Sequence, residues 1–148
     1  MPKIKAINIT NLSGESTIYV NQAILERNKG IVNDRYYKNF KKKYEQVTLI
    51  ESEKISNFNN KIKSKFNYKD FRRNIITTGI DLNKMINKKI QINNVVLKIH
   101  QLCQPCRYLQ SKLSVDNLVK LLTNKGGVRA EILQSGIITT FDEIKIIK

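Results

Sequence analysis

The sequence predicts a mainly β domain of the α+β class, in which a curled or closed β-sheet carries a few peripheral helices. Two observations support this prediction. Short stretches of alternating apolar and polar residues recur along the whole chain, whereas helical spacing of apolar residues is confined to a few segments. These helical segments are also too few and too irregularly placed to cover both faces of a parallel sheet.

The N-terminal half is expected to contain strands and one long helix. The pattern predicts strands over residues 3–10, 17–20 and 47–50. Ser52 can cap a helix that ends near Asn67, because apolar residues then recur at three- and four-residue spacing. Residues 21–46 are polar, charged and without a clear period, so we interpret them as one long loop. A loop of that length in a compact domain usually has a function.

The C-terminal half is expected to consist of hairpins separated by short helices. The pattern predicts strands over residues 75–78, 89–92, 95–100, 128–133 and 137–147. Asn93-Asn94 suit a hairpin turn because asparagine tolerates positive φ, and Ser135-Gly136 suit a second turn. A kink is expected near Phe141-Asp142. Helical segments are predicted over residues 82–86, 107–112 and 115–122.

The length of 148 residues fits a single domain, 1–148, and no internal repeat or linker divides the chain. No stretch approaches the ~18 consecutive apolar residues that a membrane-spanning helix requires. The first residues lack the apolar core and cleavage site of a secretory signal. We therefore expect a cytoplasmic protein whose two cysteines are thiols rather than a disulfide.

The formal net charge of +15 would attract phosphates, nucleic acids or acidic membrane surfaces. Most of the excess consists of lysines scattered among asparagines and isoleucines, and clustering marks a binding surface better than total charge does. A solvated lysine surface is therefore favoured over a dedicated nucleic-acid partner. The exception is the run Lys41-Lys42-Lys43, which has Tyr36, Tyr37, Phe40 and Tyr44 nearby.

The clearest chemical motif is Cys103-Gln104-Pro105-Cys106-Arg107, which we expect to lead into a helix. The first turn of a helix presents backbone N–H groups, and these groups, together with Arg107, favour the reactive thiolate of Cys106. A thioredoxin-type redox pair would need a further proline loop downstream, but Pro2 is the only other proline. Zinc is disfavoured because the two cysteines and His100 are too few ligands. Burial as a small apolar residue is the simpler interpretation of Cys103.

Two loop motifs carry cationic groups. Arg72-Arg73-Asn74 stands at the entrance to a predicted strand, where two guanidinium groups and an amide suit bidentate binding of phosphate or carboxylate. A surface ion pair with Asp70 or Glu53 explains these arginines equally well. In the long predicted loop, glycine and asparagine allow sharp turns, and Asp34 can orient Arg35.

Taken in chain order, the motifs resemble the MOSC domain, which occurs at the C-terminal end of molybdenum cofactor sulfurases and as stand-alone bacterial proteins. The resemblance covers nearly the whole chain. It rests on Gly30-Ile-Val-Asn-Asp-Arg-Tyr36, Val47-Thr-Leu-Ile-Glu51, Arg72-Arg-Asn-Ile75, Gly79-Ile-Asp-Leu82, Pro105-Cys-Arg107, Gly127-Val-Arg-Ala130 and Ser135-Gly-Ile137. Two positions depart from the family pattern: Asn33 stands where glycine is usual, and Phe141-Asp142 stands where a Gly-Asp turn is usual.

The resemblance implies a MOSC-like β-barrel that binds the anionic molybdenum–pterin cofactor. It also implies that Cys106 is the reactive cysteine, which transfers sulfur or acts as the molybdenum ligand. The cofactor-binding residues carried over are Asp34, Arg35, Arg72, Arg73 and Asn74, and we add Arg107 because it adjoins the cysteine. Cys103 has no counterpart and no assigned role.

Our leading hypothesis is a molybdenum–pterin protein that carries, sulfurates or uses its cofactor, either as a sulfur carrier or as an oxidoreductase. In fused family members pyridoxal phosphate belongs to a separate sulfurase domain, so it is not expected in this chain. The sulfur donor would be another protein of the cysteine desulfurase type, and an electron-transfer partner is the alternative. Two rival functions remain open: a cofactor-independent basic module that binds anions or nucleic acid, and a thiol enzyme acting on small sulfur compounds.

Overall fold

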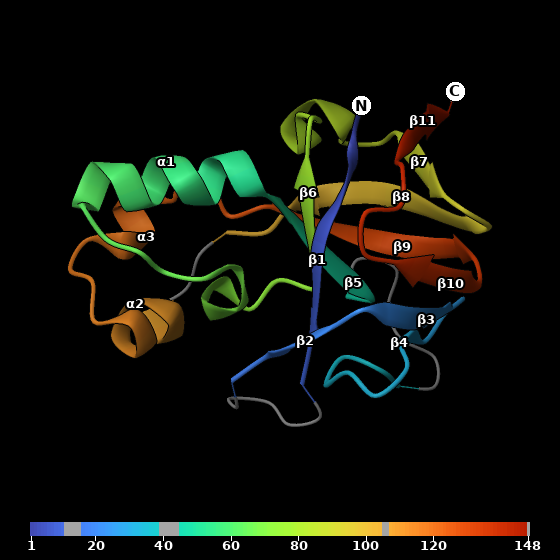
Figure 1. Ribbon diagram of the computed structural model, residues 1–148, viewed down its shortest axis with the longest axis horizontal. Coiled ribbons are helices and arrows are strands. Elements are labelled where there is room, and N and C mark those ends of the chain that lie inside the picture. The colour runs from blue at the N-terminus through green and yellow to red at the C-terminus, as the bar shows by residue number, and fades with distance from the viewer. Residues whose placement is uncertain (11–15, 39–44, 105–106, 148) are drawn as a thin grey trace.

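The computed structural model describes residues 1–10, 16–38, 45–104 and 107–147, and it confirms a mainly β protein of the α+β class. Most strands form one mixed, eight-stranded sheet (Figure 1). The strands β5 (Val47–Glu51) and β6 (Ile75–Thr78) pair in parallel, and the other described neighbours pair antiparallel. The order across the sheet is β11 (Lys145–Ile147), β7 (Lys89–Ile92), β8 (Val95–Leu102), β9 (Val128–Gln134), β5 (Val47–Glu51), β6 (Ile75–Thr78), β1 (Lys3–Ile9) and β2 (Ile18–Val20).

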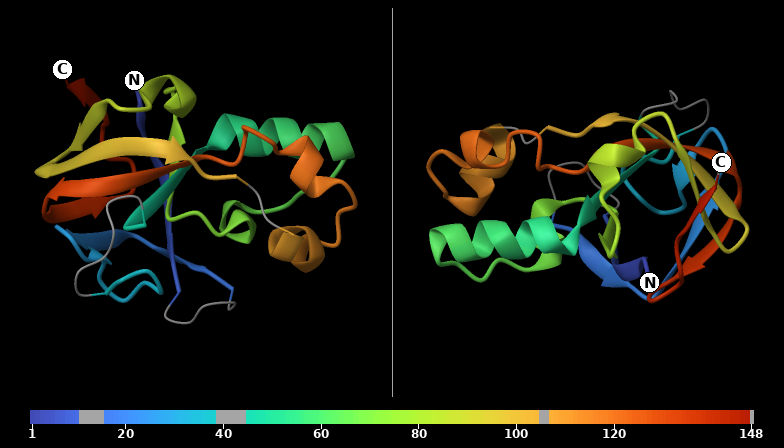
Figure 2. Two further views of the ribbon diagram at one scale, coloured as in Figure 1. Left: turned by 180° about the vertical axis from the view of Figure 1, so that it is seen from behind. Right: turned by 90° about the horizontal axis from the view of Figure 1, so that it is seen from above.

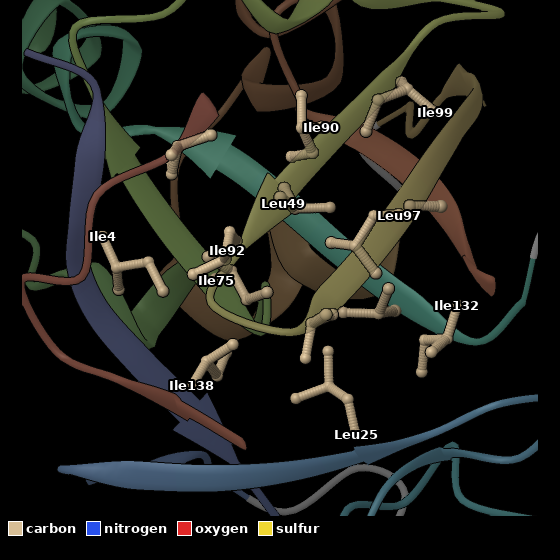
Figure 3. Packing of buried hydrophobic residues seen from close by; sticks show 14 of the residues in the cluster. Ile4, Leu25, Leu49, Ile75, Ile90, Ile92, Leu97, Ile99, Ile132 and Ile138 are labelled. Carbon is tan, nitrogen blue, oxygen red and sulfur yellow. The ribbon is translucent and has the colours of Figure 1, made fainter. Parts of the chain in front are cut away.

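A second, three-stranded sheet has the order β10 (Gly136–Thr139), β3 (Gln22–Glu26) and β4 (Gly30–Ile31). Viewed from above, the strands surround a common interior (Figure 2). Alternate residues of these strands point into it, as Val95, Leu97 and Ile99 do along β8. Leu25 and Ile138 of the three-stranded sheet meet side chains of the large sheet, such as Leu49 and Leu97, in the main hydrophobic core (Figure 3).

Of the two forms expected, a curled or a closed sheet, the structure has the curled one, and the barrel implied by the resemblance is not closed within the described part of the chain. In the described residues, β11 and β2 are the two edges of the large sheet, and no continuous ladder joins them. Single hydrogen bonds instead join β1 to the chain between β10 and β11, because Ile4 N donates to Asp142 O (2.9 Å) and Phe141 N donates to Ile4 O (2.9 Å). Continuous pairing stops because Phe141 has a φ of 74°, which bends the last predicted strand into β10 and β11. The expected kink at Phe141-Asp142 is thus confirmed.

Helices cover the other face of the large sheet at one end of the molecule (Figures 1 and 2). A second core lies beneath them, in which the rings of Phe58, Phe66 and Phe71 contact one another. The helical elements are α1 (Ser52–Ile62), α2 (Arg107–Leu113), α3 (Leu118–Leu121), and the 3₁₀ turns η1 (Tyr68–Phe71) and η2 (Leu82–Met85).

Two boundaries differ from the sequence prediction. The helix α1 ends at Ile62 rather than near Asn67, because Lys63 adopts a left-handed conformation and Ser64 N donates to Asn59 O (2.8 Å). The predicted loop 21–46 contains β3 and β4, whose inward residues Ala23 and Leu25 are buried. The interpretation of this segment as a single loop is therefore wrong for residues 22–31.

Candidate functional site

Asn74 joins three strands at the point where β6 begins. Its Oδ1 accepts hydrogen bonds from Thr48 N (3.1 Å) and Thr48 Oγ1 (3.2 Å) at the start of β5, and its Nδ2 donates to Asn8 O (3.2 Å) on β1. The residue is fully buried. Because both ends of its amide are bonded within the protein, Asn74 acts on the preceding arginines by fixing the backbone from which they extend.

The two arginines lie in the bend between η1 and β6. Arg72 has a φ of 60°, a left-handed conformation that is uncommon for a long side chain and that often occurs at functional sites. Arg73 Nε donates to Gly126 O (2.8 Å) in the turn before β9. Within the described residues, Nη1 and Nη2 of Arg73 make no hydrogen bond. They are therefore available to donate to an anion.

Asp34 and Arg35 brace this bend from the segment after β4. The Asp34 carboxylate accepts backbone N–H groups of Thr10 (3.1 Å) and Tyr36 (3.3 Å) and lies 3.5 Å from Arg35 Nη1. Arg35 Nη2 donates to Arg72 O (2.8 Å), and the guanidinium lies over the Tyr36 ring at 4.3 Å. Both charged side chains are almost completely buried. The pair thus fixes the position of the Arg72 backbone, and Asp34 orients Arg35 as the sequence predicted.

The chain that leads to the second cysteine passes the same turn. Cys103 is buried, as predicted, and its N–H donates to Gly127 O (2.8 Å). The Gln104 side chain forms two hydrogen bonds with Asn124, one from its Nε2 to Asn124 Oδ1 (2.8 Å) and one from Asn124 N to its Oε1 (2.9 Å). Residues 124–127 therefore bind both the strand end at Cys103-Gln104 and, through Gly126, the Arg73 side chain.

The structure thus brings five of the predicted site residues together: Asp34, Arg35, Arg72, Arg73 and Asn74. Cys106 lies outside the described residues, as does the side chain of Arg107, whose backbone begins α2. The basic run 41–43 also lies outside them.

Sequence reasoning missed Asn8. Its Nδ2 donates to Arg73 O (3.0 Å), and its fully buried Oδ1 has no hydrogen-bond partner among the described residues. The signal was present, because an asparagine between Ile7 and Ile9 breaks an otherwise apolar stretch of strand. A buried polar side chain of this kind is informative in itself.

His100, which was considered as a metal ligand, contacts a carboxylate instead. Its Nε2 lies 2.8 Å from Glu131 Oε1 on the neighbouring strand β9. Within the described part of the chain, no group of three His, Cys, Asp or Glu side chains is placed to hold a metal ion. Cys106, which was considered with Cys103 and His100 as a zinc ligand, lies outside the described residues.

The fold and the arginine bend define a small mainly β protein in which a cationic loop cluster and Cys103-Gln104 contact the same turn. The family profile described as "MOSC domain" matches residues 36–145, and the chain belongs to the MOSC domain family. A comparison with curated proteins gave no match. None of the helices in the described ranges has the length and apolar character needed to cross a membrane.

Solved structures share the fold at low sequence identity. The YuaD protein from Bacillus subtilis has a TM-score of 0.84 and 17% identity, with 99% of this chain and 96% of that chain covered. YiiM from Geobacillus stearothermophilus has a TM-score of 0.81 and 16% identity, with 100% and 76% covered. YiiM from Escherichia coli has a TM-score of 0.75 and 14% identity, with 99% and 70% covered.

Proposed function

We propose that this protein binds a molybdenum–pterin cofactor and that the Cys106 thiolate is its molybdenum ligand or carries sulfur to it. The observation that carries the proposal is the placement of Arg73. Its Nε is held by Gly126 O, its terminal nitrogens are available, and the same turn holds Cys103-Gln104, which directly precede the Cys106 loop.

The described residues fit the anionic part of such a cofactor. The two terminal nitrogens of Arg73 form the donor fork that suits a phosphate, and Arg72 adds a second cation from the same bend. The buried Oδ1 of Asn8, which has no hydrogen-bond partner in the described part of the chain, is an acceptor of the kind that complements N–H groups. We assign Arg72 and Arg73 to anion binding.

The other predicted site residues support these groups. Asp34, Arg35 and Asn74 use their polar atoms within the protein, so we assign them to positioning the 72–74 backbone. Arg107, next to Cys106, adds positive charge that favours the thiolate over the thiol. This division leaves the anion contacts to Arg72 and Arg73 and the sulfur chemistry to Cys106.

The chemistry assigned to Cys106 follows from its thiolate form. A thiolate is a soft ligand that suits molybdenum, and a molybdenum centre supplies two-electron redox chemistry when it is bound. In the sulfur-transfer variant, the Cys106 thiolate attacks the terminal sulfur of a donor persulfide. A new S–S bond forms on Cys106, the donor's S–S bond breaks, and the donor leaves as a thiolate. The donor is a separate protein of the cysteine desulfurase type, and a redox function would require an electron-transfer partner.

Elemental analysis and pterin fluorescence test the proposal on protein purified from a host that makes the molybdenum cofactor. We expect molybdenum and pterin in the wild type, and loss of molybdenum in Cys106→Ala but not in Cys103→Ala, which serves as the matched cysteine control. Wild-type protein without either component would contradict stable cofactor binding. Turnover of a small sulfur compound by such protein would favour the thiol-enzyme function.

A further inference from the structure

A hollow of about 480 Å³ lies among β1, β2, η1 and the residue after β10, apart from the arginine bend and its contacts. Ala6 and Val20 contribute apolar lining, and Tyr19 and Tyr68 contribute aromatic side chains from β2 and η1. Lys5 and Thr140 also line it. The volume falls in the range of roughly 300–1,000 Å³ that small-molecule sites occupy.

Hydrogen bonds fix the elements around this hollow. Thr17 Oγ1 donates to Lys69 O (2.6 Å), and Lys69 N donates to Tyr19 Oη (3.4 Å), so that η1 and β2 are tied together. Elsewhere in the lining, Thr140 N donates to Asn21 O (2.9 Å). The hollow is thus held open by the protein's own contacts before any ligand arrives.

The aromatic side chains are available for stacking. Tyr19 is 49% exposed, whereas Tyr68 is partly buried and packs on one side against the second hydrophobic core while it lines the hollow on another. A half-exposed tyrosine on an edge strand offers one ring face to a planar partner. The protein already uses that ring as a cation platform, because Lys69 Nζ lies 5.7 Å from its centre.

Among the described residues that line the hollow, the charged side chain is that of Lys5, and none is a carboxylate. Lys69 lies over Tyr19. Lys3, on the same strand as Lys5, lies over the exposed ring of Phe141 at 5.8 Å. Aromatic faces bordered by lysines favour a ligand that combines a planar ring with negative charge.

We propose that this hollow is a nucleotide-binding site. A nucleobase stacks on Tyr19 and Tyr68, and Lys5 and Lys69 contact the phosphate. The same chemistry is offered by a free mononucleotide and by a nucleotide within single-stranded nucleic acid. The site does not depend on the proposed cofactor, so either proposal can fail while the other holds.

The test uses protein from a host that lacks molybdenum cofactor synthesis, so that no pterin competes. Fluorescence anisotropy of a labelled uridine oligonucleotide of about 12 nucleotides measures strand binding, and AMP is added as a competitor. Displacement by AMP would identify a free nucleotide as sufficient, whereas binding of the oligonucleotide alone would identify a strand. Both results support the site. If neither the oligonucleotide nor AMP binds, the proposal is overturned.

Two sets of variants, three at tyrosines and two at lysines, distinguish binding at this site from binding by the general positive charge of the protein. Tyr19→Ala and Tyr68→Ala should each weaken binding about tenfold or more, whereas Tyr19→Phe, which keeps the ring and loses only the 3.4 Å hydrogen bond from Lys69 N, should weaken it much less. Lys5→Ala should weaken binding more than Lys84→Ala, an exposed lysine on η2 whose loss changes the net charge equally. Equal effects of the two lysine changes, or wild-type binding by both tyrosine-to-alanine variants, would overturn the proposal.

Discussion

At the scale of single residues, Asn74 connects sequence to site most directly. A buried asparagine at the start of a β-branched strand is unfavourable unless its amide is fully bonded, and here Thr48 and Asn8 provide the partners. The sequence placed Asn74 at the site, but it could not reveal the partners, which lie 26 and 66 positions away. Asn8 was missed for the same reason, because its hydrogen bond to Arg73 O spans 65 positions.

The first prediction concerns Asn74→Ala. This change leaves the Thr48 N–H and the Asn8 carbonyl buried without partners, and we expect it to lower the free energy of unfolding by about 2–4 kcal/mol. Denaturant unfolding measures the change. Asn57→Ala, at an exposed position of α1, is the control and should stay within about 0.5 kcal/mol of the wild type. A similar, small effect of both changes would contradict the role assigned to Asn74.

At the scale of elements, strands with regular alternation and turn asparagines were predictable. The hairpin β7–β8 turns at Asn93, whose φ of 53° is the conformation that asparagine tolerates. The prediction failed for β3 and for the end of α1. Strand β3 is short, and the exposed Ile24 between its buried residues Ala23 and Leu25 hides the alternation. The helix α1 ends before Lys63, a residue that no helix-stop pattern marks.

The second prediction concerns Glu53, in the first turn of α1, and the pH dependence of stability. Partial burial alone would raise the pKa of Glu53, but hydrogen bonds from the N–H groups of Gly79 and Glu53 itself, and from the Thr78 and Ser52 hydroxyls, lower it overall below its ordinary value of 4.5. A carboxyl whose pKa is lowered by folding stabilises the protein above its unfolded-state pKa, and this contribution is lost as the pH falls through the folded-state pKa.

We therefore expect the wild type to lose more stability than Glu53→Gln when the pH falls from about 6 to about 3. Urea unfolding at several pH values measures this difference. Asp116→Asn is the control, because it removes an exposed carboxylate that has no hydrogen bond within the described residues. Its free energy of unfolding should change with pH as that of the wild type does. The prediction would be wrong if Glu53→Gln and the wild type lost stability in parallel.

At the scale of the whole molecule, the candidate site exists because distant segments meet. The segments at 34–35, 72–74, 103–104 and 124–127 are bound together by a few hydrogen bonds, among them Arg35 to Arg72 O and Arg73 to Gly126 O. Sequence motifs identified three of these segments, and the resemblance to the MOSC family indicated that their residues act at one site. The bend at Phe141 was predicted, but the hydrogen bonds that join β1 to the chain after β10 were not, because they link opposite ends of the chain.

The central claim is that Arg73 binds the anionic part of the molybdenum–pterin cofactor, and Arg73→Gln tests it most directly. The measurement is the pterin content of both Arg73→Gln and Arg27→Gln after purification from a cofactor-producing host. Arg27 is exposed, and its change lowers the net charge by the same amount as Arg73→Gln does. Melting curves show that both remain folded. We expect pterin loss of about tenfold or more in Arg73→Gln and wild-type content in Arg27→Gln. Equal pterin in folded forms of both variants would contradict it.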